Sequence, residues 1–167
     1  NPQPKPKVGP EYSGVALGSD GEPVCVDSSM NMTSADVKKK LLELMPLIKE
    51  RLHFLTDAAE MVRFMFTEPA VPAKSEIIPK KLDEAKTKEV LEKAKSFVSE
   101  IFGMSHDDAE ALAKKYAEEL GIKLGDFMMP VRMAVTGSRI SPPLIGSIWI
   151  LGKEKACERV EKTLAAF

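Results

Sequence analysis

The stretch MPVRMAVTGSRISPPLIGSIWIL, residues Met129–Leu151, departs most from the helix-forming composition of the rest of the chain. It contains no acidic residue, and its only charged side chains are Arg132 and Arg139. A helix end, a break at residues 136–138 and a Ser-Pro-Pro corner follow one another before an apolar segment. Spaced arginines on an acid-free surface suit a polyanionic ligand, whereas the Ile, Leu and Met content is typical of buried core. Composition alone leaves both interpretations open.

The totals indicate a soluble globular domain. The chain has 167 residues, 44% of them apolar and 29% charged, which is enough to bury a sizeable core. Lys and Arg number 24 against 25 for Asp and Glu, so the net charge gives no support to nucleic-acid binding, although basic residues are in excess over 111–167. No apolar run approaches the roughly 20 residues that span a bilayer, so we expect no membrane association. Cys25 and Cys157 are far apart, which fits a reducing, cytoplasmic location.

The first half of the chain predicts two helices after an irregular start. Residues 1–32 are rich in Pro and Gly and predict a linker or a short hairpin. Thr33 and Asp36 form a capping-box pattern at the start of an apolar helical stripe, in which Pro46 predicts a kink or a break. A second helix is expected over 57–66. The three prolines of 67–83 then predict a long irregular connection and a boundary between subdomains.

The second half has clearer helical periodicity. Apolar faces predict helices over about 84–102, from 105 to 121, from 124 to 135 and over 153–167. The apolar segment 145–151 fits either a strand or a helix. We therefore predict an all-α fold of about seven helices, with a first helical subdomain over 33–70 and a second over 84–167.

A catalytic or metal site is not visible in the sequence. His53 and His106 are far from each other and from the cysteines, which makes metal ligation improbable. No glycine-rich phosphate loop occurs, and the many Glu and Lys residues fit solvated pairs on helix surfaces. We expect neither catalytic residues nor a bound metal.

Several motifs resemble a known family. PVRMAVTGS at 130–138, then SPPL at 141–144 and LGKE at 151–154, is similar to the C-terminal anticodon-binding domain of bacterial-type glutamyl-tRNA synthetases. Upstream, KERLHFL at 49–55 with RFMF at 63–66, and LGIKLG at 120–125, resemble further segments of that family in the same order. The resemblance covers 33–167, and residues 1–32 match nothing in the family.

The resemblance implies an α-helical cage of two subdomains that together form an anticodon-binding domain and hold the tRNA anticodon loop. It implies a monomer whose partner is glutamate tRNA, and whether glutamine tRNA is also served is left open. ATP and magnesium are expected only for the full-length ligase, because adenylation belongs to a Rossmann domain with HIGH-like and KMSKS-like signatures. Neither signature occurs in these 167 residues, so this chain is not expected to aminoacylate by itself.

The resemblance also assigns candidate RNA contacts. Arg51 falls on a position whose arginine contacts an anticodon base, and Arg132 falls on a helix arginine that faces the anticodon. Lys114 falls where some relatives carry a tRNA-contacting arginine, although a solvated helix lysine is the favoured explanation. Pro143 departs from the small residue common in the family. The complete candidate set is Arg51, Arg132, Ser141, Pro142, Leu144 and Lys114, and the resemblance predicts that the two arginines open onto one surface.

The alternative is a helical protein-interaction module that keeps the cage fold but has lost RNA binding. The nearly balanced charge supports this alternative. RNA binding falls steeply with added salt, whereas an apolar protein interface changes little, so a salt series distinguishes the two.

Overall fold

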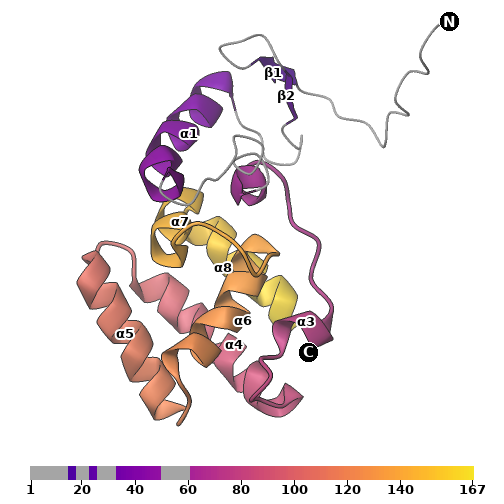
Figure 1. Ribbon diagram of the computed structural model, residues 1–167, viewed down its shortest axis with the longest axis vertical. Helices are drawn as coiled ribbons and strands as arrows, with labels where there is room; N and C mark the ends of the chain where they lie inside the picture. The colour runs from indigo at the N-terminus through magenta and orange to yellow at the C-terminus, as the bar shows by residue number, and fades with distance from the viewer. Residues whose placement is uncertain (1–14, 18–22, 26–32, 50–60) are drawn as a thin grey trace, which may run out of the picture.

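The computed structural model describes residues 15–17, 23–25, 33–49 and 61–167. Within them the chain is helical apart from one pair of short strands (Figure 1), as the predicted all-α class requires. Strands β1 (Val15–Leu17) and β2 (Pro23–Cys25) pair antiparallel, with Ala16 opposite Val24. This pairing is what the hairpin alternative for the N-terminal segment requires, and the rest of residues 1–32 lies outside the described residues.

Helix α1 (Ser34–Ile48) begins at the predicted capping box. The Asp36 backbone N–H donates to Thr33 Oγ1 at 3.2 Å, and the Thr33 N–H donates to an Asp36 carboxylate oxygen at 2.9 Å. The helix does not break at Pro46 but continues to Ile48, and the Lys49 N–H still donates to the Met45 carbonyl at 3.0 Å. A proline this close to the C-terminal end removes little of the hydrogen-bond ladder, which is why the helix tolerates it.

The connection between the two halves is mostly irregular, as predicted. The first part of the helix expected over 57–66 lies outside the described residues; Met61 and Val62 are helical, and the chain then forms a 3-10 turn, η2 (Arg63–Met65). Phe64 and Met65 of this turn are buried. One short helix, α3 (Lys74–Ile77), interrupts the predicted irregular stretch.

Five helices form the main bundle: α4 (Glu84–Glu100), α5 (His106–Glu119), α6 (Leu124–Thr136), α7 (Leu144–Leu151) and α8 (Lys153–Leu164). The side chains of Asp83 and Ser105 cap α4 and α5. The four predicted helices of this half are confirmed. The ambiguous apolar segment is helix α7, which follows the Pro142-Pro143 corner and ends at Gly152, whose φ is +99°.

The core joins α1 to the bundle. Phe97 of α4 meets Phe127 of α6 edge-on, with ring centroids 5.6 Å apart, and the same hydrophobic cluster includes Val37 and Leu44 of α1. Helix α1 packs on α7 at Gly146, where a Cβ would lie 2.9 Å from Leu47 Cδ1. The division into subdomains over 33–70 and 84–167 stays a prediction. Within the described ranges, no helix is both long and apolar enough to span a membrane.

Candidate nucleic-acid interface

Arg132 holds the Ser-Pro-Pro corner in place. From the last half of α6 its Nη1 donates to the Pro142 carbonyl at 3.2 Å and to the Ser141 carbonyl at 3.4 Å, and it also donates to Ser141 Oγ. Ser141 Oγ in turn donates to the Pro142 carbonyl at 3.0 Å. These hydrogen bonds fix the backbone of the corner, defined here as residues 141–144, against the helix that precedes it.

The corner itself is mostly buried. Ser141 and Leu144 are each 3% exposed as whole residues, and Pro142 is buried as well. The surface available for the predicted RNA contacts therefore comes largely from the neighbours of the corner. Ile140, immediately before it, is 76% exposed, and Arg132 is only partly buried. Helix α7 starts at Leu144, and its N-cap residue, Pro143, makes no side-chain capping hydrogen bond.

The other two predicted basic contacts lie elsewhere. Lys114 is exposed on α5 and pairs with Glu110 one turn earlier, with Nζ 3.1 Å from Oε1, which is the solvated-lysine alternative of the sequence prediction. Arg51 lies outside the described residues, so the expectation that Arg51 and Arg132 share one surface stays a prediction. Ser141, Pro142, Leu144 and Arg132 are brought together, and Lys114 belongs to a separate helix.

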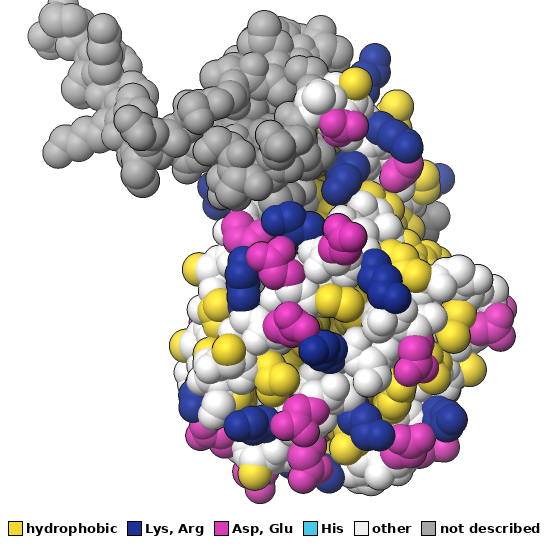
Figure 2. All heavy atoms as spheres, turned by 180° about the vertical axis from the view of Figure 1, so that it is seen from behind, with side chains coloured by type: hydrophobic (Ala, Val, Ile, Leu, Met, Phe, Trp, Pro, Cys, Tyr) yellow, Lys and Arg dark blue, Asp and Glu magenta, His cyan; other side chains and the backbone are white. Residues whose placement is uncertain are grey.

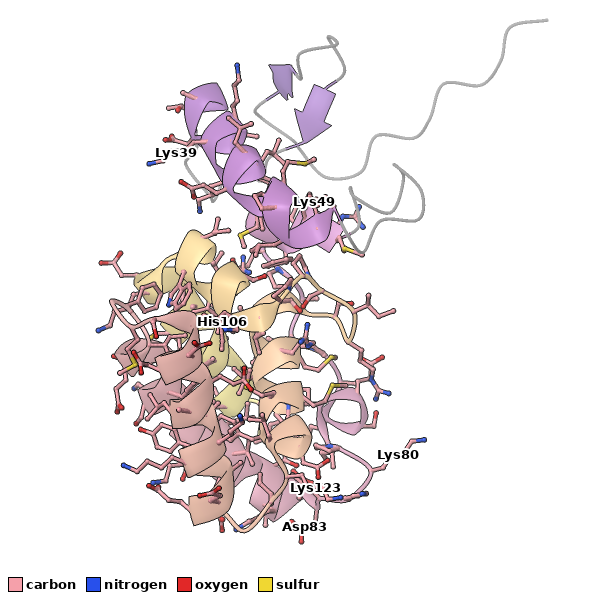
Figure 3. The ribbon with its side chains drawn as sticks, turned by 60° about the vertical axis from the view of Figure 1, so that its left-hand side comes forward. Lys39, Lys49, Lys80, Asp83, His106 and Lys123 are labelled. Carbon is pink, nitrogen blue, oxygen red and sulfur yellow. The ribbon has the colours of Figure 1, made fainter. Side chains whose placement is uncertain are left out.

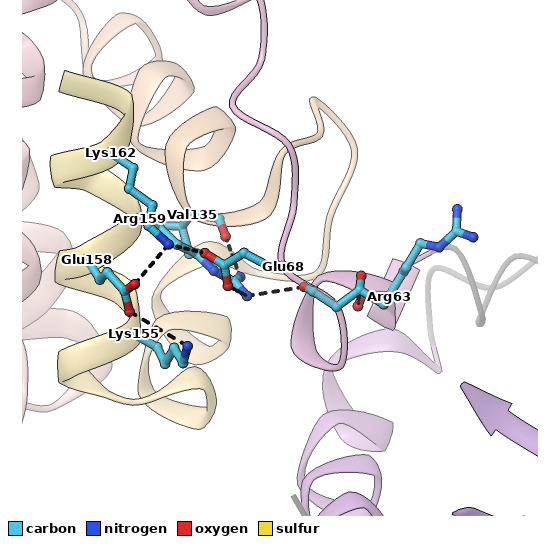
Figure 4. A network of polar contacts seen from close by, with 8 residues as sticks. Arg63, Glu68, Val135, Lys155, Glu158, Arg159 and Lys162 are labelled. Atoms are coloured by element: carbon cyan, nitrogen blue, oxygen red, sulfur yellow. Dashed lines mark hydrogen bonds and ion pairs between the residues drawn. The ribbon is translucent and has the colours of Figure 1, made fainter. Parts of the chain in front are cut away.

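Sequence reasoning missed Arg159, which is the most buried charged residue of the described chain at 2% exposure. Its Nη1 donates to the Val135 carbonyl at 2.8 Å, and its Nη2 donates to the Thr67 carbonyl and to Glu68 Oε2, both at 3.3 Å. Lys162 Nζ reaches the other Glu68 oxygen at 3.1 Å (Figure 4). Burial lowers the pKa of the Arg159 guanidinium, and the Glu68 carboxylate opposes that shift.

This Arg159 network fixes the segment after η2 against the ends of α6 and α8. A signal for it exists in the sequence. Arg159 lies between Ala156 and Val160 on the apolar stripe of the last helix, and a charged residue inside such a stripe indicates a buried, paired side chain. A second contact that the sequence did not predict joins Arg139 to α3, where Nη2 donates to the Glu76 carbonyl at 3.1 Å.

The surface of the described chain carries charges of both signs. On the face seen in Figure 2, Lys and Arg side chains alternate with Asp and Glu side chains, without a patch of one sign. Figure 3 places Lys39 on α1 and Lys49 just after the end of that helix, in the upper half of the view, and Lys80, Asp83 and Lys123 at the bottom of the view. The acid-free run from Phe127 to Lys153 therefore stands out against a mixed surface. Among the described residues, no group of three His, Cys, Asp or Glu side chains is arranged to hold a metal.

The chain matches a family model described as an anticodon binding domain over residues 23–164. It is 58% identical over 128 residues to the glutamate–tRNA ligase of Treponema denticola, covering 77% of this chain and 25% of the ligase. It is 48% identical over 127 residues to the glutamate–tRNA ligase of Treponema pallidum, covering 76% of this chain and 24% of that protein. The chain thus spans about a quarter of the length of these relatives.

A solved structure has the same fold. The model superposes on a glutamate tRNA ligase from Elizabethkingia meningosepticum, solved in complex with its amino acid, with a TM-score of 0.65. The identity is 23%, and the match covers 83% of this chain and 26% of that one. With the family model covering most of its length, the chain belongs to the anticodon-binding domain family of glutamate–tRNA ligases.

Proposed function

We propose that this chain binds the anticodon loop of a tRNA as the recognition module of a glutamate–tRNA ligase. The observation that carries the proposal is the set of hydrogen bonds from Arg132 to Ser141 and Pro142. They give the acid-free stretch a rigid, preformed corner beside a partly exposed cation. Specific RNA recognition uses unstacked loop bases that are bound along their edges by arginine and backbone groups.

Arg132 acts in two ways in this proposal. One nitrogen of the guanidinium holds the corner backbone, so the corner needs no rearrangement when RNA arrives, and preorganisation lowers the cost of binding. The partly exposed side chain also brings positive charge next to the corner, where phosphate contacts add salt-dependent affinity. The residues proposed to contact RNA are Arg51, Arg132, Ser141, Pro142, Leu144 and Lys114.

The activity of a whole ligase is proposed for the complete protein and not for this chain. There, a catalytic domain attaches glutamate to tRNA in the cytoplasm, with ATP and magnesium as cofactors. The tRNA partner is the glutamate acceptor, and the oligomeric state is proposed to be monomeric. The relatives named above support this proposal by their own description as glutamate–tRNA ligases.

The test is a titration of a labelled glutamate-tRNA anticodon stem-loop by fluorescence anisotropy. Wild type is compared with Arg132→Ala and with the matched control Lys80→Ala, which removes an exposed positive charge at the far end of the bundle (Figure 3). We expect Arg132→Ala to weaken binding by about tenfold or more and Lys80→Ala to change it little. Equal affinities for all three proteins would contradict the proposal.

Selectivity supplies an independent test. Arg51→Gln is expected to reduce discrimination at one anticodon base, by on the order of 1–3 kcal/mol, while leaving the fold intact. Stem-loops with each anticodon base replaced in turn identify that base. If the discrimination of the variant equals that of wild type at all three positions, Arg51 has no role in base selection.

The second candidate is the protein-interaction module without RNA binding, which the balanced net charge favours. A salt series discriminates, because each phosphate neutralised by the protein adds to the slope of log affinity against log salt. A steep negative slope supports RNA binding. A flat slope together with weak affinity at low salt supports the protein-interaction module.

A further inference from the structure

A cleft of about 290 Å³ opens between the η2 segment and the loop after α6. One wall comes from Met61, Arg63, Phe64 and the start of the connection at Pro69. The other wall comes from residues 136–138 and Ile140, immediately before the corner. Its volume is at the small end of the range for small-molecule pockets, about 300–1,000 Å³. It is large enough for one ring system and too small for a helix.

The charge in this cleft has one sign. Among the described residues of the lining, Arg63 is the only charged one, and none is a carboxylate. Arg63 is exposed, and within the described chain its guanidinium makes no recorded ion pair or hydrogen bond. Figure 4 shows its side chain directed away from the Arg159 network, although both lie near the same connection. An exposed, unneutralised arginine beside a small cleft suits an anionic ligand.

The walls combine apolar and polar side chains and are held in place. Ile140 is 76% exposed and thus contributes nothing to the core of the described chain. The single hydroxyl proton of Thr136 has two acceptors within reach, the Arg132 carbonyl at 2.9 Å and the Ser138 carbonyl at 3.0 Å, and the same oxygen accepts from the Ser138 N–H at 3.3 Å, which fixes the loop. Across the cleft, Pro69 is anchored through its neighbour Glu68 to Arg159 and Lys162. The cleft is therefore present before any ligand binds.

We propose that this cleft holds one unstacked base of the anticodon loop, with the phosphate of that nucleotide paired to Arg63. The proposal rests on the proposed function, because it needs RNA at the adjacent corner. Ser138 and Ile140 line the cleft and lead directly into Ser141, so a single strand that crosses the corner reaches the cleft within one or two nucleotides. The apolar side chains of the lining suit the face of a base, its hydroxyl groups suit the polar edge, and Arg63 suits the phosphate, which is the chemistry of single-strand recognition.

The test combines a cleft-filling variant with abasic RNA. Ala70 is exposed and lines the cleft, so Ala70→Phe fills it without changing charge. The matched control is Ala111→Phe, an equal substitution at an exposed position of α5. Anticodon stem-loops are prepared with a single abasic nucleotide at each loop position in turn, and dissociation constants are measured for wild type, Ala70→Phe and Ala111→Phe.

For wild type and Ala111→Phe we expect a loss of affinity of about 5- to 100-fold at one abasic position that occupies the cleft. For Ala70→Phe the same abasic nucleotide should cost nothing further, because the filled cleft no longer receives the base. Arg63→Ala should weaken the binding of intact stem-loops, whereas Lys80→Ala should not. Thermal unfolding of each variant verifies that it is folded.

The outcomes separate the two proposals. If wild type fails to bind the stem-loop at low salt, the proposed function fails. If wild type binds but every abasic position costs the same in Ala70→Phe as in Ala111→Phe, the base-binding cleft is overturned while the proposed function stands. Affinity of Arg63→Ala equal to that of wild type likewise overturns the phosphate contact.

Discussion

Two arginines, Arg159 and Arg132, each fasten an irregular segment to the bundle, but in different surroundings. Arg159 is 2% exposed and donates to two backbone carbonyls and a carboxylate. Arg132 is partly exposed and donates to two backbone carbonyls and a hydroxyl at the corner. A buried cation needs a counter-charge and acceptors, because its desolvation is costly. Arg159 has the Glu68 carboxylate and two carbonyls, and its Nε alone among its nitrogens lacks a hydrogen-bond partner in the described chain. A partly exposed arginine loses less of its hydration, and part of the Arg132 side chain faces solvent beside the corner.

The difference separates a structural role from a binding role. Arg159 stabilises the position of Glu68 and Thr67, and its loss should be measured as lower stability. Arg132 holds the corner that is proposed to meet RNA, and its loss should be measured chiefly as weaker binding. Four substitutions test this division.

Arg159→Ala should have the largest effect on folding, about 3 kcal/mol of unfolding free energy, because it leaves two backbone carbonyls without their donor and removes one of the two cations paired with the partly buried Glu68. Urea denaturation monitored by Trp149 fluorescence measures it. Arg159→Met, which restores apolar volume but no donor, should recover part of the loss. A stability of Arg159→Ala close to that of wild type would assign Arg159 no structural role.

Arg132→Ala should cost less stability, about 1–2 kcal/mol, because Ser141 Oγ keeps its hydrogen bond to the Pro142 carbonyl. The same denaturation experiment gives the value, and anisotropy titration gives the RNA affinity. The comparison predicts that Arg132→Ala is the milder of the two arginine variants in unfolding and the more severe in RNA binding. The reverse order would invert the assigned roles.

Tyr116 provides a neutral donor for comparison, since its hydroxyl donates to Glu100 Oε1 at 2.9 Å. Tyr116→Phe should cost about 1 kcal/mol at neutral pH. Burial, together with the hydrogen bond to Glu100, raises the pKa of Tyr116 from 10.0 to about 12. The folded state therefore favours the neutral phenol, and this stabilisation is present below pH 10 and is lost between about pH 10 and 12.

A pH series of unfolding free energies for wild type and Tyr116→Phe measures that loss. The difference in unfolding free energy between wild type and Tyr116→Phe should become smaller as the pH rises from about 10 to 12. Ultraviolet absorbance gives the titration of the phenol directly, with the variant as the reference for the remaining tyrosine. A constant difference across the window would mean that Tyr116 titrates normally.

Lys162→Ala should have the smallest effect, although Lys162 pairs with the same Glu68 as Arg159 does. Lys162 is exposed, and exposed ion pairs contribute little. Its hydrogen bonds to Glu158 and Glu68 raise its pKa, so its contribution is present below the ordinary lysine pKa and is lost as the pH rises above it. Thermal unfolding of Lys162→Ala and Arg159→Ala in parallel measures the difference between the two destabilisations. The effect of Lys162→Ala should shrink in high salt, because salt screens an exposed ion pair.

The sequence pattern predicted those helices whose formation depends on nearby residues. The capping pattern of Thr33 and Asp36 and the apolar faces of α4, α5, α6 and α8 depend on neighbours within a few residues, and the structure follows them. The segment 145–151 was undecidable because a short apolar run has no diagnostic period. Its helical state depends on the preceding prolines and on packing against α1.

Sequence periodicity could not predict contacts between residues that are far apart in the chain. Arg159 and Glu68 are 91 residues apart, and Arg139 and Glu76 are 63 residues apart, so no local pattern pairs them. The corner was located by family resemblance, but its buried side chains were not foreseen, because exposure depends on the packing of α7 and not on the motif. The RNA contacts assigned to the corner stay a prediction for the same reason.

Gly137 has a consequence for the mutational tolerance of the chain. Its φ is +68°, and a Cβ there would lie 2.7 Å from Pro69 Cβ. Every other residue type would combine backbone strain with a collision against the segment that Arg159 fastens. In a saturation library selected for folding, this position should therefore accept fewer substitutions than Gly125, which has an ordinary φ and no atom within 4 Å of its Cβ site. A single backbone position thus limits which sequences can keep α6, the connection and the corner together.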